Sequence, residues 1–291
     1  VAGKLPRPGV AIGEFILDLS AVHDLGIDLG SFKKEELLAP VLNPMMAHGK
    51  KAMAMLRERI AYLLDAKNDE LKGLSEKVLV KQSHAKMHLP VHIGDYTDFY
   101  SSIDHATNVG MMFRDPANAL LPNWKHLPVG YHGRSSSILV SGEPIYRPKG
   151  QTRPDPEQNP VYGPCRLLDF ELEMGFITFD GKPLGQSIST AEAEEHIFGM
   201  LIFNDWSARD IQKWEYIPLG PFLAKNFASS ISPWIVTLEA LKPFKVKGEK
   251  QEPAVLPYLR FEGNHNIDID LEVEILPEQG EGKVVSHSNY K

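Results

Sequence analysis

The decapeptide LDFELEMGFI, residues 168–177, alternates apolar and acidic side chains with a period of two. A β-strand with this pattern places Asp169, Glu171 and Glu173 on one face and an apolar core layer on the other. Carboxylates two residues apart on a strand lie about 7 Å from each other and repel by about 2 kcal/mol at an effective dielectric constant near 20. Either water screens this repulsion or a hard cation reverses it. The stretch therefore predicts a strand with a solvated acidic face or one half of a cation site.

A second stretch, IDIDLEVEI at residues 267–275, has the same alternation. On pattern alone, each stretch is best interpreted as an antiparallel strand with one solvated face, which is the commoner origin of such a stripe. Neither acidic stripe by itself indicates a cation. Partners from elsewhere in the chain must distinguish the two.

The composition is typical of a soluble globular protein, with 43% hydrophobic and 24% charged residues among 291. This length predicts one large or two moderate domains. A net charge of −7 argues against nucleic acid as a partner. No apolar run approaches the roughly 20 residues that span a bilayer, and no signal peptide pattern opens the chain. A single cysteine, Cys165, excludes an internal disulfide framework, so we expect a cytoplasmic protein without a membrane partner.

The pattern along the chain predicts two domains, residues 1–88 and residues 89–291. The first contains a short hairpin signal around Gly13, a helix with an apolar stripe that includes Met53 and Leu56, and a strand at 78–80. The second is mainly β, with long loops of the kind that often carry function. A capping-box pattern at 189–192 also predicts a short helix. The expected strands of the second domain cover residues 138–140, 168–177, 200–203, 234–238 and 267–275.

The segment GDYTDFYSSIDHATN, residues 94–108, carries the first candidate catalytic residues. Ser101 and Asp104 resemble a capping box, which predicts a helix that begins there with His105 in its first turns. The positive end of a helix disfavours imidazolium, so His105 could act as a neutral base. Asp98 lies just upstream and could reach a metal. The alternative, which this segment alone favours, is that Asp98 is a turn residue and His105 a surface residue.

The segment FGMLIFNDWSARDIQ, residues 198–212, predicts a buried strand that ends at Asp205 and is followed by a helix. A carboxylate at a strand end is a rigidly held position for a ligand. Arg209 and Gln212 are spaced i, i+3 and could bind an anionic substrate oxygen, with Tyr216 one turn further along. The alternative is that Asp205 caps the helix and pairs with Arg209. The sequence supports the two interpretations equally.

Three further side chains are weaker candidates. Lys225 is an isolated cation in an apolar loop bracketed by Pro and Gly, and Arg114 and Tyr131 could contact an anion or a ring. The position of Lys225 mildly favours a functional role, whereas Arg114 and Tyr131, each taken alone, are better interpreted as structural residues. The sequence has no glycine-rich phosphate loop, no cysteine pair with zinc spacing and no serine nucleophile elbow. These absences argue against the corresponding enzyme classes.

Five segments, in this order along the chain, together resemble the fumarylacetoacetate hydrolase family. The Glu-x-Glu of the acidic stretch is shared with decarboxylases, isomerases and hydratases of the wider superfamily, whereas GDYTDFY and NDWSARDIQ narrow the resemblance to the branch that cleaves fumarylacetoacetate. The resemblance runs nearly from end to end of the chain. The five segments are residues 94–100, 105–108, 120–124, 168–174 and 204–212.

The resemblance implies an N-terminal SH3-like barrel and a C-terminal mixed β-sandwich roll, a mainly β (α+β) fold that forms a homodimer. It implies a Ca²⁺ ion held by four carboxylates, which suit a hard cation. A Mg²⁺ site would involve Lys225 and Ser229, although Ala228-Ser229 stands where the family usually has Gly-Thr. The residues implied as metal ligands are Asp98, Glu171, Glu173 and Asp205 for Ca²⁺, and Asp205, Lys225 and Ser229 for Mg²⁺.

The reaction that the resemblance implies is metal-dependent hydrolysis of a β-diketo acid, fumarylacetoacetate, to fumarate and acetoacetate in tyrosine and phenylalanine catabolism. In the implied roles, His105 is the base that activates water, and the metal polarises the diketone as a Lewis acid. The donors implied for the developing oxyanion or carbanion are Arg209, Gln212 and Lys225. The implied substrate contacts are Tyr100, Arg114, Tyr131, Arg209, Gln212 and Tyr216.

The family's catalytic domain normally continues beyond the position that matches Lys291, and the continuation includes the glutamate that orients the catalytic histidine. We therefore expect that the sequence represents the catalytic domain without its C-terminal part. Two alternatives remain open at this stage. One is a related acylpyruvate hydrolase or decarboxylase with the same metal site, and the other is a non-catalytic fragment that acts through dimerisation or metal binding.

Overall fold

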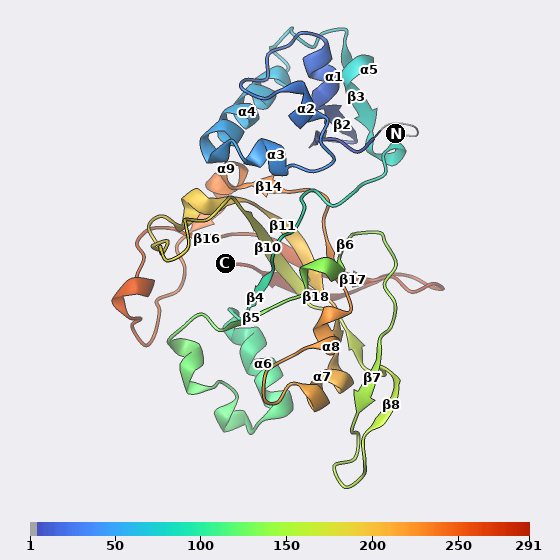
Figure 1. Cartoon of the computed structure of the whole chain (residues 1–291), viewed down its shortest axis with the longest axis vertical. Coiled ribbons are helices and arrows are strands. Elements are labelled where there is room, and N and C mark those ends of the chain that lie inside the picture. Colours follow the sequence, from blue (N-terminus) through green and yellow to red (C-terminus); the bar gives the residue numbers. More distant parts are fainter. Residues whose placement is uncertain (1–4) are drawn as a thin grey trace.

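The computed structural model describes residues 5–291, and its N-terminal part is a small antiparallel sheet with helices (Figure 1). Gly13 makes the predicted hairpin possible because its φ of +54° lies in the left-handed region that glycine tolerates. The sheet is antiparallel in the order β1 (Gly9–Ile12), β2 (Phe15–Asp18) and β3 (Leu79–Lys81). The SH3-like barrel is not confirmed by this sheet of three strands, and it stays a prediction.

The N-terminal core is built around helix α4 (Gly49–Leu63), the amphipathic helix predicted from its apolar stripe. Met53, Leu56 and Ile60 are buried in one cluster that also contains Phe198 of the second part of the chain. Hydrophobic packing therefore joins the two parts. The other elements of the N-terminal part are α1 (Leu19–Asp24), α2 (Lys34–Leu37), α3 (Asn43–Met46), α5 (Ser75–Val78) and the 3₁₀ turn η1 (Gln82–His84).

A five-stranded sheet forms the centre of the second part. Its buried side chains Ile138, Phe203 and Ile231 form an apolar cluster, and the strand predicted from the run before Asp205 lies in the middle of the sheet. The pairs are antiparallel except that β13 and β6 run parallel. The sheet follows the order β10 (Leu172–Thr178), β11 (Ile197–Asp205), β13 (Ser229–Ile231) and β6 (Ile138–Val140), with β14 (Val236–Thr237) also paired with β11.

Shorter strand pairs and helices surround this sheet, which gives an α+β fold with mixed sheets (Figure 1). None of the helices in residues 5–291 has the length and hydropathy of a membrane-spanning segment. The strand pairs are β4 (Thr97–Phe99) with β5 (Gly130–His132), β7 (Lys149–Thr152) with β8 (Val161–Pro164), β9 (Leu168–Asp169) with β12 (Ser207–Ala208), β15 (Lys245–Val246) with β16 (Asn266–Ile267), and β17 (Asp270–Ile275) with β18 (Lys283–Asn289). The helices are α6 (Ile103–Phe113), α7 (Arg209–Glu215), α8 (Leu223–Asn226) and α9 (Leu238–Leu241), and the 3₁₀ turns are η2 (Pro116–Asn118), η3 (Pro122–Lys125), η4 (Ser135–Ser137), η5 (Ala193–His196), η6 (Lys242–Phe244) and η7 (Pro257–Leu259).

The acidic stretch at residues 168–177 is not the single strand that its alternation predicts. The strand breaks after Asp169 because β9 pairs with β12 whereas β10 pairs with β11. Between the two strands, the Glu171 carbonyl accepts a hydrogen bond from the Asp205 amide at 3.1 Å. The α-helix predicted from the capping-box pattern at 189–192 does not form. The Ser189 amide and Oγ both donate to Glu192 Oε2, at 3.0 and 2.7 Å, and a 3₁₀ turn with Glu192 at its N-cap follows.

Candidate active site

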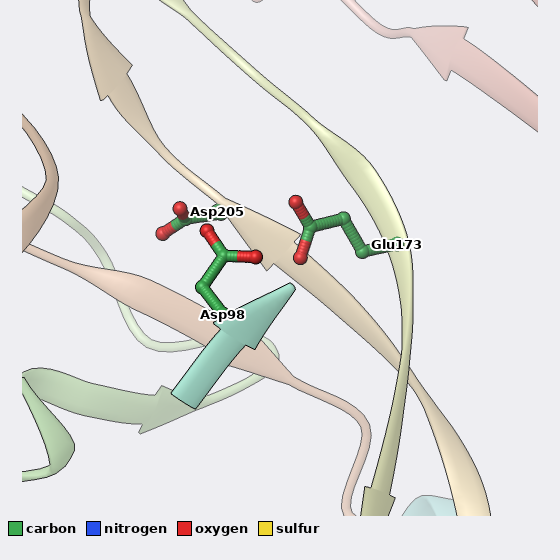
Figure 2. Close-up of side chains that lie close together, drawn as sticks. All are labelled: Asp98, Glu173 and Asp205. Atoms are coloured by element: carbon green, nitrogen blue, oxygen red, sulfur yellow. The ribbon is translucent and has the colours of Figure 1, made fainter. Parts of the chain in front are cut away.

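Three carboxylates that are distant in sequence converge in the second part of the chain. Figure 2 shows Asp98 on β4, Glu173 on β10 and Asp205 at the end of β11, with their side chains pointing toward one another. One oxygen of each lies within 4.8 Å of the others. The antiparallel pairing of β10 with β11 brings Glu173 beside the end of β11, so the sheet register creates part of the cluster.

The electrostatics of this cluster oppose full ionisation. Burial, followed by the charge of Asp205, raises the pKa of Asp98 to about 6. Burial, followed by the charges of Asp98 and Asp205, raises the pKa of Glu173 to about 9. The pKa of Asp205 is also raised, mainly by burial. Carboxylates that repel one another in a low-dielectric site either retain protons or bind a cation, and oxygen ligands favour a hard cation such as Ca²⁺ or Mg²⁺.

Glu171 has a different environment from its neighbour Glu173. Its side chain is 8% exposed, and its carboxylate accepts hydrogen bonds from Lys225 Nζ and, at 2.6 Å, from Arg209 Nη2. His105 Nε2 lies 3.5 Å from the same carboxylate. Burial alone would raise the pKa of Glu171, but these three partners hold it below its ordinary value. The structure therefore places Glu171 among cationic side chains, outside the cluster of three carboxylates.

Lys225 joins Glu171 to the carboxylate cluster. It lies on α8 with a side chain only 6% exposed, and its Nζ is 2.9 Å from Asp205 Oδ2. Burial opposes its charge, but Glu171 and Asp205 raise its pKa, so it remains an ammonium ion. Ser229 Oγ donates to Asp205 Oδ1 at 2.9 Å. Asp205 therefore pairs with Lys225 and not with Arg209, and α7 begins after Ala208 rather than at a capping Asp205.

Arg209, the first residue of α7, is held on three sides. Its Nε donates to Asp169 Oδ2 at 2.9 Å, and its Nη1 donates to Gln212 Oε1 at 3.1 Å. The i, i+3 spacing had predicted that Arg209 and Gln212 point the same way, and this hydrogen bond confirms it. The contact with Glu171 completes the set. A guanidinium fixed in this way is preorganised to bind an oxyanion or a carboxylate.

His105 lies in the first turn of α6, close to the Glu171 carboxylate that Arg209 and Lys225 also contact. The helix begins one residue later than predicted, because Ser102 rather than Ser101 caps it and accepts a hydrogen bond from the His105 amide at 3.2 Å. The His105 side chain is 39% exposed, which leaves it accessible to water. The ring of Tyr100 contacts the imidazole edge-on, with 5.5 Å between the ring centroids.

The remaining predicted residues lie around the cluster at different depths. Tyr131 is the register partner of Asp98, and its hydroxyl donates to Asp205 Oδ2 at 3.4 Å. Arg114 instead donates two hydrogen bonds, at 2.6 and 3.2 Å, to the carbonyl of Ala119, so it fixes the loop after α6. Tyr216 is half-buried at the C-terminal end of α7.

Two residues at the site were not identified from the sequence. Asp169 was not among the residues implied as ligands or substrate contacts, and the structure shows that it anchors Arg209. Tyr96 lies next to the cluster, with its ring 5.2 Å from that of Phe203. The spacing along the sequence could have indicated Tyr96. It precedes Asp98 by two residues and therefore shares its face in an extended segment.

Comparisons with known proteins identify the family. The family model "Fumarylacetoacetase N-terminal" matches residues 2–90, and "Fumarylacetoacetate (FAA) hydrolase C-terminal" matches residues 96–291. The chain is 51% identical to fumarylacetoacetase of Homo sapiens, over 98% of this chain and 70% of the relative. It is 53% identical to fumarylacetoacetase of Dictyostelium discoideum, over 98% of this chain and 68% of the relative.

A solved structure shares the fold. It is titled "Crystal structure of a putative HpcE protein from Mycobacterium smegmatis" and superposes with a TM-score of 0.53 at 19% identity, over 98% of this chain and 73% of that chain. At this identity the match supports the fold alone. The two family models together match nearly all of the sequence, and the relatives share half of its residues. The chain therefore belongs to the fumarylacetoacetase family.

Proposed function

We propose that the chain hydrolyses a carbon–carbon bond of fumarylacetoacetate to give fumarate and acetoacetate, the last step of tyrosine and phenylalanine catabolism. The observation that carries this proposal is the 51% identity to human fumarylacetoacetase over 98% of the chain. The arrangement of the site supports it. A base candidate, a fixed guanidinium and a carboxylate cluster lie within one continuous set of contacts.

The carboxylate cluster fits a divalent cation, and we assign Ca²⁺ to Asp98, Glu173 and Asp205. Among residues 5–291, Glu173 has no side-chain hydrogen bond or ion pair to another residue, so its carboxylate is available to a cation. Glu171 would have to give up one of its present ion pairs to join the set. Asp205, Lys225 and Ser229 would lie at a Mg²⁺ site. A cation at these positions would supply Lewis-acid polarisation of the diketone oxygens.

In the proposed reaction His105 removes a proton from water, and the resulting hydroxide adds to the carbonyl carbon on the fumaryl side. The adjacent carbon–carbon bond then breaks, its electron pair passes to the methylene carbon of the acetoacetyl part, and a proton returns to that carbon. Glu171, 3.5 Å from His105 Nε2, stabilises the imidazolium that forms. The donors proposed for the developing negative charge are Arg209, Gln212 and Lys225, and the further substrate contacts are Tyr100, Arg114, Tyr131 and Tyr216.

The test is loss of the diketone absorbance when fumarylacetoacetate is added to the purified chain. His105→Ala should lower kcat by about 10²- to 10⁴-fold, the usual contribution of a general base, and leave Ca²⁺ affinity unchanged. His126→Ala is a matched control, because His126 is exposed in the loop after η3. Absence of turnover by the unaltered chain, with turnover of acylpyruvates instead, would reassign it to an acylpyruvate hydrolase.

We also propose that the protein is a cytoplasmic homodimer with two domains, residues 1–88 and 89–291, an SH3-like barrel followed by a β-sandwich roll, with no nucleic acid or membrane partner. The family resemblance supports this arrangement. Exposed apolar side chains between α7 and α8, namely Ile217, Leu219 and Phe222, are compatible with a subunit interface. Light scattering should give a mass twice the 32.5 kDa of one chain. A mass of one chain at micromolar concentration would exclude the dimer.

A further inference from the structure

The hydroxyl of Tyr96 is buried and has no hydrogen-bond partner. Within residues 5–291 only one other buried side-chain atom, Nδ1 of His23 in the N-terminal part, shares this property. A buried polar group without a partner costs free energy, so native structures almost always supply one. The Tyr96 hydroxyl therefore lacks a partner in the arrangement without a cation, and we expect the occupied site to supply one.

Strand geometry places Tyr96 next to the carboxylate cluster. It lies two residues before Asp98, and the Gly133 amide donates to its carbonyl at 2.9 Å, so the pairing of β4 with β5 continues to this position. Its ring packs 5.2 Å from Phe203. Phe203 lies two residues before Asp205 and is the register partner of Glu173. The ring of Tyr96 therefore contacts a residue that shares a strand face with Asp205 and lies directly opposite Glu173.

The ring of Tyr96 is held firmly in this position. A side-chain carbon at Gly133 would lie 2.0 Å from two ring carbons of Tyr96, so the backbone at Gly133 passes directly over the ring. The ring also packs against the apolar cluster that contains Ile138, Leu201 and Ile231. This close packing fixes the direction of the hydroxyl.

The hydroxyl of Tyr96 can donate a hydrogen bond through its O–H group. Glu173, the cross-strand partner of Phe203, also has no hydrogen bond or ion pair to another of the described residues. An unpaired donor and an unpaired acceptor therefore belong to the two residues on either side of Phe203, at the proposed cation site.

We infer that Tyr96 is a positioning residue of the cation site, whose hydroxyl donates a hydrogen bond to Glu173 or to a water bound by the cation, and so orients the ligand set. This inference rests on the cation site of the proposed function. Partners that orient the ligands of a metal commonly change its affinity by about 10- to 100-fold when removed. Tyr96 would act in this way without touching the substrate.

The experiment is calorimetric titration of Ca²⁺ into the purified chain and its Tyr96→Phe variant, which keeps the ring and removes only the hydroxyl. We expect the variant to bind Ca²⁺ about 10-fold more weakly or worse. Tyr162→Phe is the matched control, because the Tyr162 side chain on β8 is 73% exposed and should leave Ca²⁺ affinity unchanged. In chelator, Tm of Tyr96→Phe should be unchanged or higher, because the hydroxyl has no protein partner to lose.

Two results would overturn the inference while leaving the cation site in place. One is equal Ca²⁺ affinity of the unaltered chain and Tyr96→Phe. The other is a Tm that falls by several degrees in chelator, which would show that the hydroxyl has a partner within the protein. If the unaltered chain bound no Ca²⁺ at all, this result would contradict the proposed cation site itself, and the role inferred for Tyr96 would be excluded as a consequence.

Discussion

The two acidic stripes of this chain have the same sequence alternation and opposite environments. In the first, at residues 168–177, Glu171 is 8% exposed and is surrounded by cationic partners. In the second, at residues 267–275, every acidic side chain is exposed, and Asn289 Nδ2 donates to Asp268 and Asp270 at 2.7 and 3.0 Å. Alternation decides which side chains share a face. The elements that pack on that face decide whether it becomes a surface or a site.

The largest expected difference between the stripes is in stability. Glu171→Gln removes the charge that compensates Lys225 and Arg209, so it should cost about 3–5 kcal/mol, as loss of one partner from a buried ion pair usually does. Glu272→Gln makes the same chemical change at an exposed position and should stay within about 0.5 kcal/mol of the parent. Urea unfolding in the presence of chelator measures both. Equal losses of unfolding free energy in the two variants would show that the ion pairs of Glu171 do not stabilise the fold.

The pH dependence should also separate the stripes. Glu173 has a pKa raised from 4.5 to about 9, so the folded chain holds a proton that the unfolded chain releases. The stability due to this proton is fully present below pH 4.5 and is lost as pH rises toward 9, by about 1.4 kcal/mol for each pH unit.

Unfolding free energies measured in chelator between pH 5 and 9 should show this decline. Glu173→Gln should flatten it, because the amide holds no titrating proton, and Glu274→Gln on the exposed stripe should not. Excess Ca²⁺ should oppose the decline by favouring the ionised carboxylates. A stability that rises with pH across this range would contradict the environment described for Glu173.

Local patterns predicted much of the fold and some of the site. The hairpin follows from the turn signal at Gly13, helix α4 from its apolar stripe and strand β11 from a continuous apolar run, and these predictions are confirmed. The interruption between β9 and β10 could not be predicted, because it depends on two different partner strands. The pairing of Glu171 with Lys225 joins residues 54 positions apart, which no local pattern encodes.

The smallest expected difference concerns Asp169, which anchors Arg209 from a position that is 44% exposed. A partly exposed ion pair contributes about 0.2–1 kcal/mol, and Glu171 and Gln212 still hold Arg209 when it is lost. Asp169→Asn should therefore raise KM for fumarylacetoacetate by about fivefold at most. Asp270→Asn, its counterpart on the exposed stripe, should leave KM unchanged. A larger rise in KM for Asp270→Asn than for Asp169→Asn would contradict the placement of the substrate site at the first stripe.

The most direct test of the difference between the stripes is a Ca²⁺ titration of three proteins: the unaltered chain, Glu173→Gln and Glu272→Gln. Calorimetry should show binding by the unaltered chain and by Glu272→Gln with the same Kd, and a loss of at least about tenfold in affinity for Glu173→Gln. Equal Ca²⁺ affinity in all three proteins, or binding abolished by the change at Glu272, would contradict the cation site at the first stripe.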